Sequence, residues 1–154
     1  MKNNTDTENF WSGKRVLITG HTGFKGSWLT LWLQSMDAEL RGVALHPPTI
    51  KNMFDICNIA KGIDHQIADI RDFELVFKLI KDFQPEIIFH MAAQPLVRLS
   101  YEQPIQTYAT NVMGTVHVLE AALRADCVKS FVNVTTDKCY ANNDLEVSFK
   151  EDEP

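Results

Sequence analysis

The sequence predicts an α/β fold built on a doubly wound parallel sheet. Short apolar runs alternate along the chain with longer stretches in which apolar residues recur at helical spacing. This alternation is typical of repeated strand–helix–strand units. The fourth apolar run, residues 87–91, is almost continuous, as expected for a central parallel strand that is buried on both faces. A glycine-rich turn after the first apolar run indicates the same fold class.

The elements follow one another in the order that such a sheet requires. We predict strands over 14–19, 39–45, 65–69, 87–91 and 130–135, helices over 23–36, 72–83 and 104–125, and a loop with a short helix over 49–64. The first helix carries an apolar face made by Trp28, Leu29, Trp32 and Leu33, and the long helix a stripe made by Val112, Val116, Leu119 and Leu123. The pair Pro47–Pro48 ends the second strand, because proline cannot donate to a sheet ladder.

After Tyr140 the apolar pattern gives way to a polar stretch rich in Asp and Glu. No predicted helix follows the fifth strand, although a parallel sheet needs cover on both faces. We therefore expect residues 1–154 to form an incomplete α/β domain, truncated after the fifth strand.

Composition and charge exclude several classes of protein. The chain has 154 residues, 45% hydrophobic residues and a formal net charge of -5, which disfavours a nucleic-acid or anionic-membrane surface. Cys57, Cys127 and Cys139 show no C-x-x-C spacing, so we predict free thiols and no metal site. The N-terminus lacks an apolar signal core, and the most apolar helical stretch, 28–33, is too short to span a bilayer. We predict a cytoplasmic protein.

The turn between the first strand and the first helix has the pattern of a phosphate-binding site. Gly20, Gly23 and Gly26 fall at G-x-x-G-x-x-G spacing. Such glycines allow a tight turn and a close approach of the backbone to a pyrophosphate, which the helix N-terminus then attracts. We assign Gly20, Thr22, Gly23, Phe24 and Gly26 to the phosphates of a dinucleotide in a Rossmann-like fold. A purely structural glycine turn is the alternative.

This glycine spacing resembles that of the extended short-chain dehydrogenase/reductase family. The resemblance implies NAD as the cofactor and an acidic residue at the end of the second strand that holds the adenosine ribose. The matching position here is His46, which is not acidic. A neutral imidazole can bond a ribose hydroxyl, and a charged one can meet a 2′-phosphate. NAD or NADP, and a solvated loop histidine in place of a ribose contact, stay open at this position.

Two further segments match cofactor motifs of that family. Asp69 and Ile70 follow the third strand and match a pair that bonds the adenine edge, and Asp72 is predicted to cap the next helix. The H-x-A-A motif of residues 90–93 follows the fourth strand. By resemblance the small residues lie along the cofactor, so we assign Ala92, Ala93 and Gln94 to its lining and interpret the preceding histidine as a satisfied core residue.

The end of the fifth strand carries the residues suited to chemistry on a sugar. Thr135, Thr136, Asp137 and Lys138 stand there together. With the stretches TGHTGFKGSWL, HMAAQPLVRLSY, TYATNVMGTVH and TTDKCY, the chain resembles the sugar-nucleotide 4,6-dehydratases over about 10–140. The Asp-Lys pair before Cys-Tyr is similar to that of the branch acting on CDP-glucose. Thr135 is assigned to the cofactor site with Asn111, whose family counterpart organises the active site.

The resemblance implies a three-step reaction on a CDP-sugar. NAD takes a hydride from C4, water leaves across C5 and C6, and the hydride returns to C6. Thr136 would form a hydrogen bond with the C4 oxygen, and Asp137 would act as general acid on the C6 hydroxyl. Lys138 stands where relatives have a glutamate base and would need a lowered pKa to act as one. Its alternative is a solvated loop lysine.

The family's Tyr-x-x-x-Lys pair does not occur within these 154 residues. In the family this pair and a C-terminal substrate domain come later in the chain. The resemblance therefore implies that residues 1–154 are an incomplete N-terminal NAD-binding domain without the substrate domain, inactive alone although its parent is an enzyme. Another sugar-nucleotide dehydratase or epimerase, or a non-catalytic dinucleotide-binding module, are the alternatives. By family, a homodimer of the full-length parent and a role in bacterial deoxysugar or O-antigen synthesis are expected, with neither nucleic acid nor membrane as partner.

Overall fold

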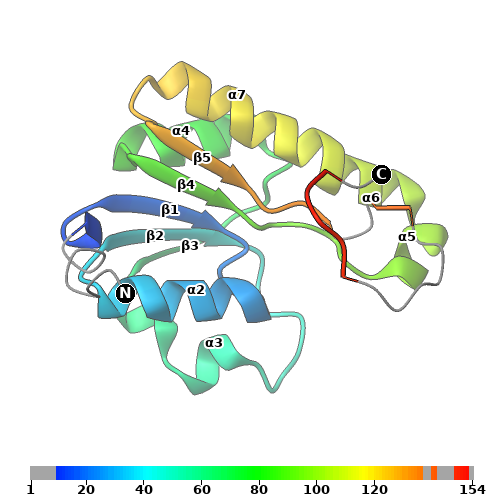
Figure 1. Ribbon diagram of the computed structural model, residues 1–154, viewed down its shortest axis with the longest axis horizontal. Coiled ribbons are helices and arrows are strands. Elements are labelled where there is room, and N and C mark those ends of the chain that lie inside the picture. Colours follow the sequence, from blue (N-terminus) through cyan, green and yellow to red (C-terminus); the bar gives the residue numbers. More distant parts are fainter. Residues whose placement is uncertain (1–9, 137–139, 142–147, 153–154) are drawn as a thin grey trace.

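A five-stranded parallel sheet forms the centre of the protein. The computed structural model describes residues 10–136, 140–141 and 148–152. The strands follow the spatial order β3-β2-β1-β4-β5, and every neighbouring pair is parallel (Figure 1). Their bounds are β1 Arg15–Thr19, β2 Glu39–Ala44, β3 Asp64–Ile67, β4 Ile87–His90 and β5 Ser130–Asn133. The predicted α/β fold with a doubly wound parallel sheet is confirmed.

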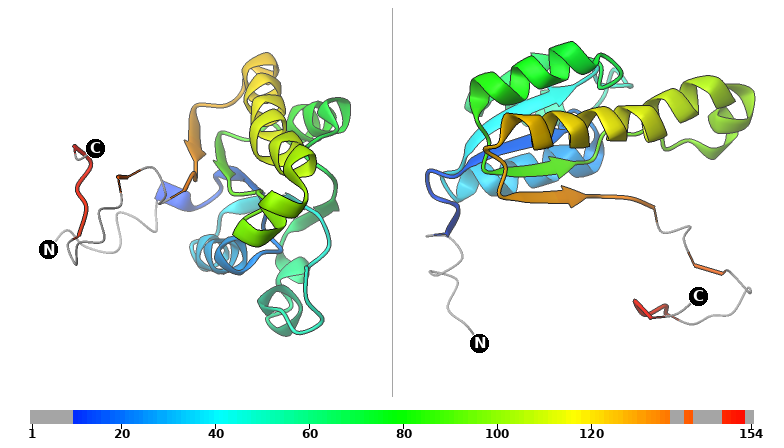
Figure 2. Two further views of the ribbon diagram at one scale, coloured as in Figure 1. Left: turned by 90° about the vertical axis from the view of Figure 1, so that its right-hand side faces the viewer. Right: turned by 90° about the horizontal axis from the view of Figure 1, so that it is seen from above.

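Helices cover both faces of this sheet. The helices are α2 Phe24–Ser35, α3 Met53–Ile56, α4 Phe73–Phe83, α5 Val97–Glu102, α6 Pro104–Tyr108 and α7 Thr115–Ala125, with a 3-10 helix η1 at Ile59–Gly62 and a π-helix η2 at Ala109–Gly114. Figure 2 shows α4 and α7 on one face and α2 on the other. Two cores result, because successive strand side chains point to opposite faces. Leu17 belongs to the core under α4 and α7, whereas Val16 and Ile18 belong to the core under α2.

The start of α4 follows the predicted capping chemistry. The Asp72 carboxylate accepts the backbone N–H of Leu75 at 3.1 Å. An aspartate at this position satisfies one of the amide groups that have no partner within the helix, and its charge complements the helix dipole. The prediction of Asp72 as a helix cap is confirmed.

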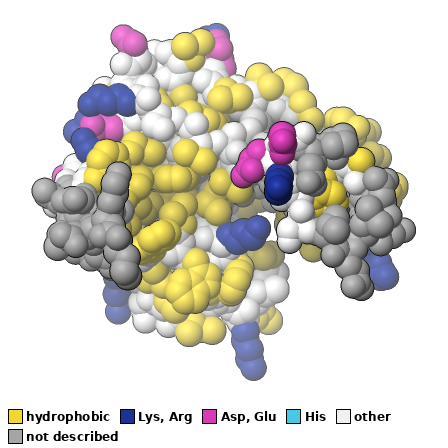
Figure 3. All heavy atoms as spheres, in the orientation of Figure 1, with side chains coloured by type: hydrophobic (Ala, Val, Ile, Leu, Met, Phe, Trp, Pro, Cys, Tyr) yellow, Lys and Arg dark blue, Asp and Glu magenta, His cyan; other side chains and the backbone are white. Residues whose placement is uncertain are grey.

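The apolar face predicted for the first helix packs only in part. Leu33 is buried and Leu29 packs against the same core, whereas Trp28 and Trp32 are 57% and 64% exposed. The other buried positions of α2 are Gly26, Ser27 and Thr30. Small residues on the inner face let the helix backbone approach the sheet closely. Figure 3 shows apolar side chains gathered over α2 and the neighbouring strands.

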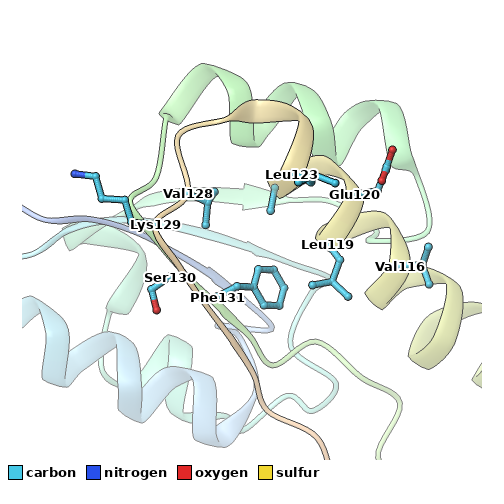
Figure 4. A pocket seen from close by; sticks show the side chains of 9 residues that line it. Val116, Leu119, Glu120, Leu123, Val128, Lys129, Ser130 and Phe131 are labelled. Carbon is cyan, nitrogen blue, oxygen red and sulfur yellow. The ribbon is translucent and has the colours of Figure 1, made fainter.

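The long predicted helix is divided by the π-helix η2. Its inner face is made by Val118, Ala121 and Ala122, while the predicted stripe from Val112 to Leu123 is exposed. An apolar groove runs between α7 and the edge strand β5, lined by side chains that include Leu119, Leu123 and Phe131 (Figure 4). Within the described ranges, no helix is both long enough and apolar enough to cross a membrane.

Candidate functional site

The predicted cofactor loops all leave the same edge of the sheet. Because the strands are parallel and nearly in register, Thr19 is level with Val43 on one side and with His90 on the other. The turn after β1, the segment after β3 and the segment after β4 therefore meet at the carboxyl ends of the strands. Open α/β sheets bind their ligands at this edge. The apolar groove beside α7 has no comparable set of converging polar groups.

Two glycines of the turn, Gly20 and Gly26, lie too close to neighbouring backbone for a side chain. Gly20 has a φ of +78°, and a Cβ there would lie 2.8 Å from the backbone nitrogen of Ala92. A Cβ on Gly26 would overlap the carbonyl oxygen of Gly20. The turn thus lies against both the segment after β4 and the first turn of α2. Gly23 caps α2 with no side-chain hydrogen bond, so the amide groups of this helix start are suited to an anion.

Hydroxyl groups hold the rest of the turn in place. Thr22 donates its hydroxyl to the carbonyl oxygen of Leu45 at 2.9 Å, which ties the turn to the end of β2. Ser27 donates to the carbonyl oxygen of His21 at 3.0 Å. Phe24, the first residue of α2, is 71% exposed.

A buried histidine in the turn was missed by the sequence analysis. His21 is fully buried, and its Nε2 lies 2.7 Å from Nδ1 of His65 on β3. Gly42 on β2 makes room for the ring, because a Cβ there would lie 2.5 Å from it. Burial, with the charge of His65 as a smaller cause, lowers the pKa of His21 to about 4. The sequence signal was a histidine between the first two glycines of the turn.

The predicted ribose residue His46 follows the end of β2. Its side chain is exposed, and its charge is the second cause, after burial, of the lowered pKa of His65. The structure therefore brings three histidines to this side of the site, of which the sequence analysis named one.

The segment after β3 carries an ion pair at the predicted adenine position. The Asp69 carboxylate accepts the backbone N–H of Arg71 at 2.9 Å and pairs with its guanidinium at 2.6 Å. Hydrogen bonds from Arg71 hold the pKa of Asp69 below its usual value. Arg71 also donates to Gln106 on α6. Ile70 is buried, and its carbonyl oxygen lies 3.2 Å from Nδ1 of His117. An ionised carboxylate keeps lone pairs for a further donor such as an amino group.

The segment after β4 is held by backbone hydrogen bonds to side chains at both ends. The hydroxyl oxygen of Thr19 accepts the N–H groups of Met91 at 3.0 Å and Ala92 at 3.1 Å. At the other end, Asn111 accepts the N–H of Gln94 at 2.8 Å and donates to its carbonyl oxygen at 3.0 Å. Ala92 and Gln94 are half-buried, and Ala93 between them is exposed. Asn111 lies in the π-helix, a distortion that occurs frequently at functional sites.

The predicted catalytic residues follow β5. Thr135 and Thr136 are exposed beyond the end of this strand. Asp137 and Lys138 lie outside the described residues. The structure therefore brings together the glycine turn, Asp69 with Ile70, the 92–94 segment and Asn111. Among the side chains that the structure describes, no three His, Cys, Asp or Glu groups form a metal site.

A parallel sheet with this glycine turn at its carboxyl edge defines a dinucleotide-binding fold of the extended dehydrogenase/reductase type. The chain belongs to the GDP-mannose 4,6 dehydratase family, whose model matches residues 17–154. The chain is 56% identical over 147 residues to the CDP-glucose 4,6-dehydratase of Salmonella typhimurium, an alignment that covers 96% of this chain and 41% of the relative. The resemblance to that branch of the 4,6-dehydratases is confirmed.

Solved structures of related enzymes share the fold. The UDP-glucose 4-epimerase of Stenotrophomonas maltophila, determined with bound NAD, matches with a TM-score of 0.75 at 26% identity, covering 86% of this chain and 40% of that one. The UDP-glucose 4-epimerase of Thermus thermophilus, determined in complex with NAD, matches with a TM-score of 0.64 at 30% identity, covering 73% of this chain and 35% of that one. The chain thus spans less than half the length of each of these relatives.

Proposed function

We propose that this chain supplies the NAD-binding part of a dehydratase that converts CDP-glucose to CDP-4-dehydro-6-deoxyglucose. The observation that carries the proposal is the glycine turn at the carboxyl edge of the sheet, packed so closely that a Cβ on Gly20 would strike the backbone of Ala92. Such a cradle suits a pyrophosphate and leaves no space for a larger residue. The 56% identity to the Salmonella CDP-glucose enzyme supports the choice of substrate.

Each part of the dinucleotide has its own residues in this proposal. The backbone of the glycine turn and the start of α2 hold the pyrophosphate, with Thr22 fixing the turn. Asp69 and Ile70 border the adenine, and His46 borders its ribose. Ala92, Ala93, Gln94 and Thr135 line the path toward the nicotinamide, and Asn111 holds Gln94 from behind. Two related epimerases whose structures contain NAD favour NAD over NADP.

The chemistry that NAD supplies in such a reaction is acceptance of a hydride from sugar C4 and its return to C6. In the proposed site, Thr136 forms a hydrogen bond with the C4 oxygen and keeps the sugar aligned. Asp137 donates a proton to the leaving C6 hydroxyl. Lys138 takes the position of the base that removes the proton at C5, for which a lowered pKa is required. The Tyr-x-x-x-Lys pair and the substrate domain belong, in this proposal, to a longer parent protein.

An epimerase acting on a UDP-sugar is the second candidate. It is favoured by the related UDP-glucose 4-epimerases, at 26% and 30% identity. The higher identity to the CDP-glucose enzyme places it behind the dehydratase. A comparison of turnover on CDP-glucose and UDP-glucose by the parent protein separates the two: a dehydratase yields a 4-keto product, and an epimerase yields the C4 epimer.

Three measurements test the main proposal. We expect the 154-residue chain to bind NAD in titration calorimetry and to show no turnover of CDP-glucose. The coding sequence beyond Pro154 is expected to contain a Tyr-x-x-x-Lys pair within a few dozen codons. Absence of NAD binding would refute the cofactor assignment. Turnover by the isolated chain would refute the assignment of the remaining catalytic residues to a longer parent protein.

We also propose the setting in which the parent protein works. A homodimer in the bacterial cytoplasm is consistent with the free thiols of Cys57 and Cys127 and with the exposed apolar stripe on α7. Sugars of the kind produced here enter surface polysaccharides such as O-antigen and lipopolysaccharide, which is the proposed use of the product. Light scattering of the parent protein tests the oligomeric state.

A further inference from the structure

We propose that His90 is a positioning residue for the cofactor segment after β4, acting as a neutral imidazole with its proton on Nε2. In this form it joins the two anchors of that segment, Thr19 and Asn111, through one continuous chain of hydrogen bonds. The inference deepens the proposed function and rests on the assignment of residues 92–94 to the cofactor.

The first half of the argument concerns Thr19. Its hydroxyl oxygen already accepts two backbone N–H groups, those of Met91 and Ala92. The same oxygen lies 2.7 Å from Nδ1 of His90. If Nδ1 carried a proton, three donors would point at one hydroxyl oxygen, and the hydroxyl proton would have no acceptor among the residues that the structure describes. Since a hydroxyl group has one proton and two acceptor lone pairs, Thr19 donates and Nδ1 accepts.

The second half concerns Thr115 at the start of α7. With Nδ1 unprotonated, the proton of the neutral ring lies on Nε2, which is 3.0 Å from the Thr115 hydroxyl oxygen. Thr115 in turn donates to the backbone carbonyl oxygen of Asn111 at 2.8 Å. Each donor in this series of hydrogen bonds thus has one acceptor, and all the hydrogen bonds run in the same direction, from Thr19 to Asn111.

The chain of hydrogen bonds ends on both sides at the cofactor segment. Thr19 holds the N–H groups at its start, and the Asn111 side chain holds the N–H and the carbonyl oxygen of Gln94 at its end. His90 is the link between these anchors across the interior of the sheet. A change at the histidine or at Thr115 therefore alters the position of both ends of the segment.

The surroundings of His90 favour the neutral form. Its side chain is 2% exposed, and the groups that face it are Thr19 from β1, Thr115 from α7 and Phe131 from β5, none of which titrates in the range where histidine does. Burial lowers the pKa of His90 to about 4. A protonated ring would also deprive the Thr19 hydroxyl of its acceptor. The hydrogen-bond network and the burial therefore both favour the neutral ring.

Nitrogen-15 NMR of the cofactor-free 154-residue chain tests the tautomer directly. We expect the His90 ring to show a protonated Nε2 and an unprotonated Nδ1, with no titration between about pH 5.5 and 8. A proton on Nδ1, or a titration midpoint near that of free histidine, would overturn the proposal. This readout does not depend on NAD, so it stands even if the proposed cofactor function fails.

A pair of variants tests the positioning role. Thr115→Val keeps the shape but removes the hydroxyl group, so the amide signals of Met91, Ala92 and Gln94 are expected to shift and the NAD dissociation constant to rise about tenfold. Thr115→Ser keeps the hydroxyl group and is expected to restore both to within about twofold of the original chain. Unchanged amide signals in a folded Thr115→Val chain would contradict the proposal, and failure of that variant to fold leaves the tautomer measurement to decide.

Discussion

At the scale of single residues, the position of the glycine turn depends on a space that one glycine of β2 provides. Gly42 lies on β2, a strand away from the turn, and its missing side chain is what admits the His21 ring. The ring also contacts Phe54 of α3, with centroids 5.3 Å apart, and bonds His65. The position of the turn is therefore set partly by residues outside the glycine motif.

We predict that Gly42→Ala destabilises the protein by about 1–3 kcal/mol, since the added methyl group would lie 2.5 Å from a rigid, buried ring. Chemical denaturation measures the effect. The double variant Gly42→Ala with His21→Ala is expected to recover part of the loss, because the smaller residue removes the overlap. Strict additivity of the two single changes would show that the two sites do not interact.

At the scale of elements, the start of α4 and the segment after β4 are each held by a specific side chain. Asp72 caps α4, and Asn111 in the π-helix holds the 92–94 segment by two hydrogen bonds. The cap could be predicted from sequence because it depends on residues three positions apart. The Asn111 bond pair could not, because its partner Gln94 lies in a different element and the π-turn has no marker in the sequence.

Removal of the α4 cap gives an element-scale prediction. Asp72→Ala is expected to lower the free energy of unfolding by about 0.5–2 kcal/mol, because the N–H of Leu75 loses its acceptor. Asp72→Asn retains a side-chain oxygen and is expected to lose less. Equal losses in the two variants, measured by urea denaturation, would argue against the cap as the cause.

The two hydrogen bonds between Asn111 and Gln94 give a second prediction at this scale. Asn111→Ala removes both bonds to Gln94, and we expect faster amide hydrogen exchange at Gln94 together with weaker NAD binding, by about tenfold. Asn111→Asp keeps an acceptor for the Gln94 N–H but places a carboxylate oxygen near its carbonyl oxygen. This variant is expected to bind NAD no better than Asn111→Ala, and near-normal binding in either would contradict the assigned role.

At the scale of the whole molecule, the buried histidines link stability to pH. Burial lowers the pKa of both His21 and His90 to about 4, below the ordinary value of 6.5 that applies in the unfolded chain. Between these values the unfolded chain binds more protons than the folded protein does, so protons favour unfolding. The stabilising contribution is complete above about pH 6.5 and is lost as the pH falls toward 4.

We predict a fall in the free energy of unfolding of roughly 3 kcal/mol per buried histidine between pH 6.5 and 4. Denaturation midpoints across this range measure it. His21→Ala removes one of the two groups. The fall in its free energy of unfolding between pH 7 and 4 is therefore expected to be about half that of the unmodified chain. A flat profile in the original chain would show that neither ring is held neutral by folding.

Sequence patterns correctly predicted those features that depend on residues close together in the chain. The strand and helix order, the carboxyl-edge loops and the cap at Asp72 follow from short-range rules of periodicity, turn geometry and capping. The packing face of α2 was only partly predictable in this way, because Leu29 and Leu33 of the predicted face pack and the two tryptophans do not. Trp28 and Trp32 have the greater hydrophobicity, yet close packing on the sheet requires the small side chains of Gly26 and Ser27 on the inner side.

The sequence by itself therefore determined the fold class, the family and the loops that meet at the cofactor edge. Only the tertiary structure decided which side chains hold those loops: His21 against Gly42, and Thr19, His90 and Thr115 between the two ends of the 92–94 segment. These contacts join residues up to 73 positions apart, as between Thr19 and Ala92. Hydrogen bonds and close packing at such separations depend on how strands and helices come together, a relation that no local pattern of residues contains.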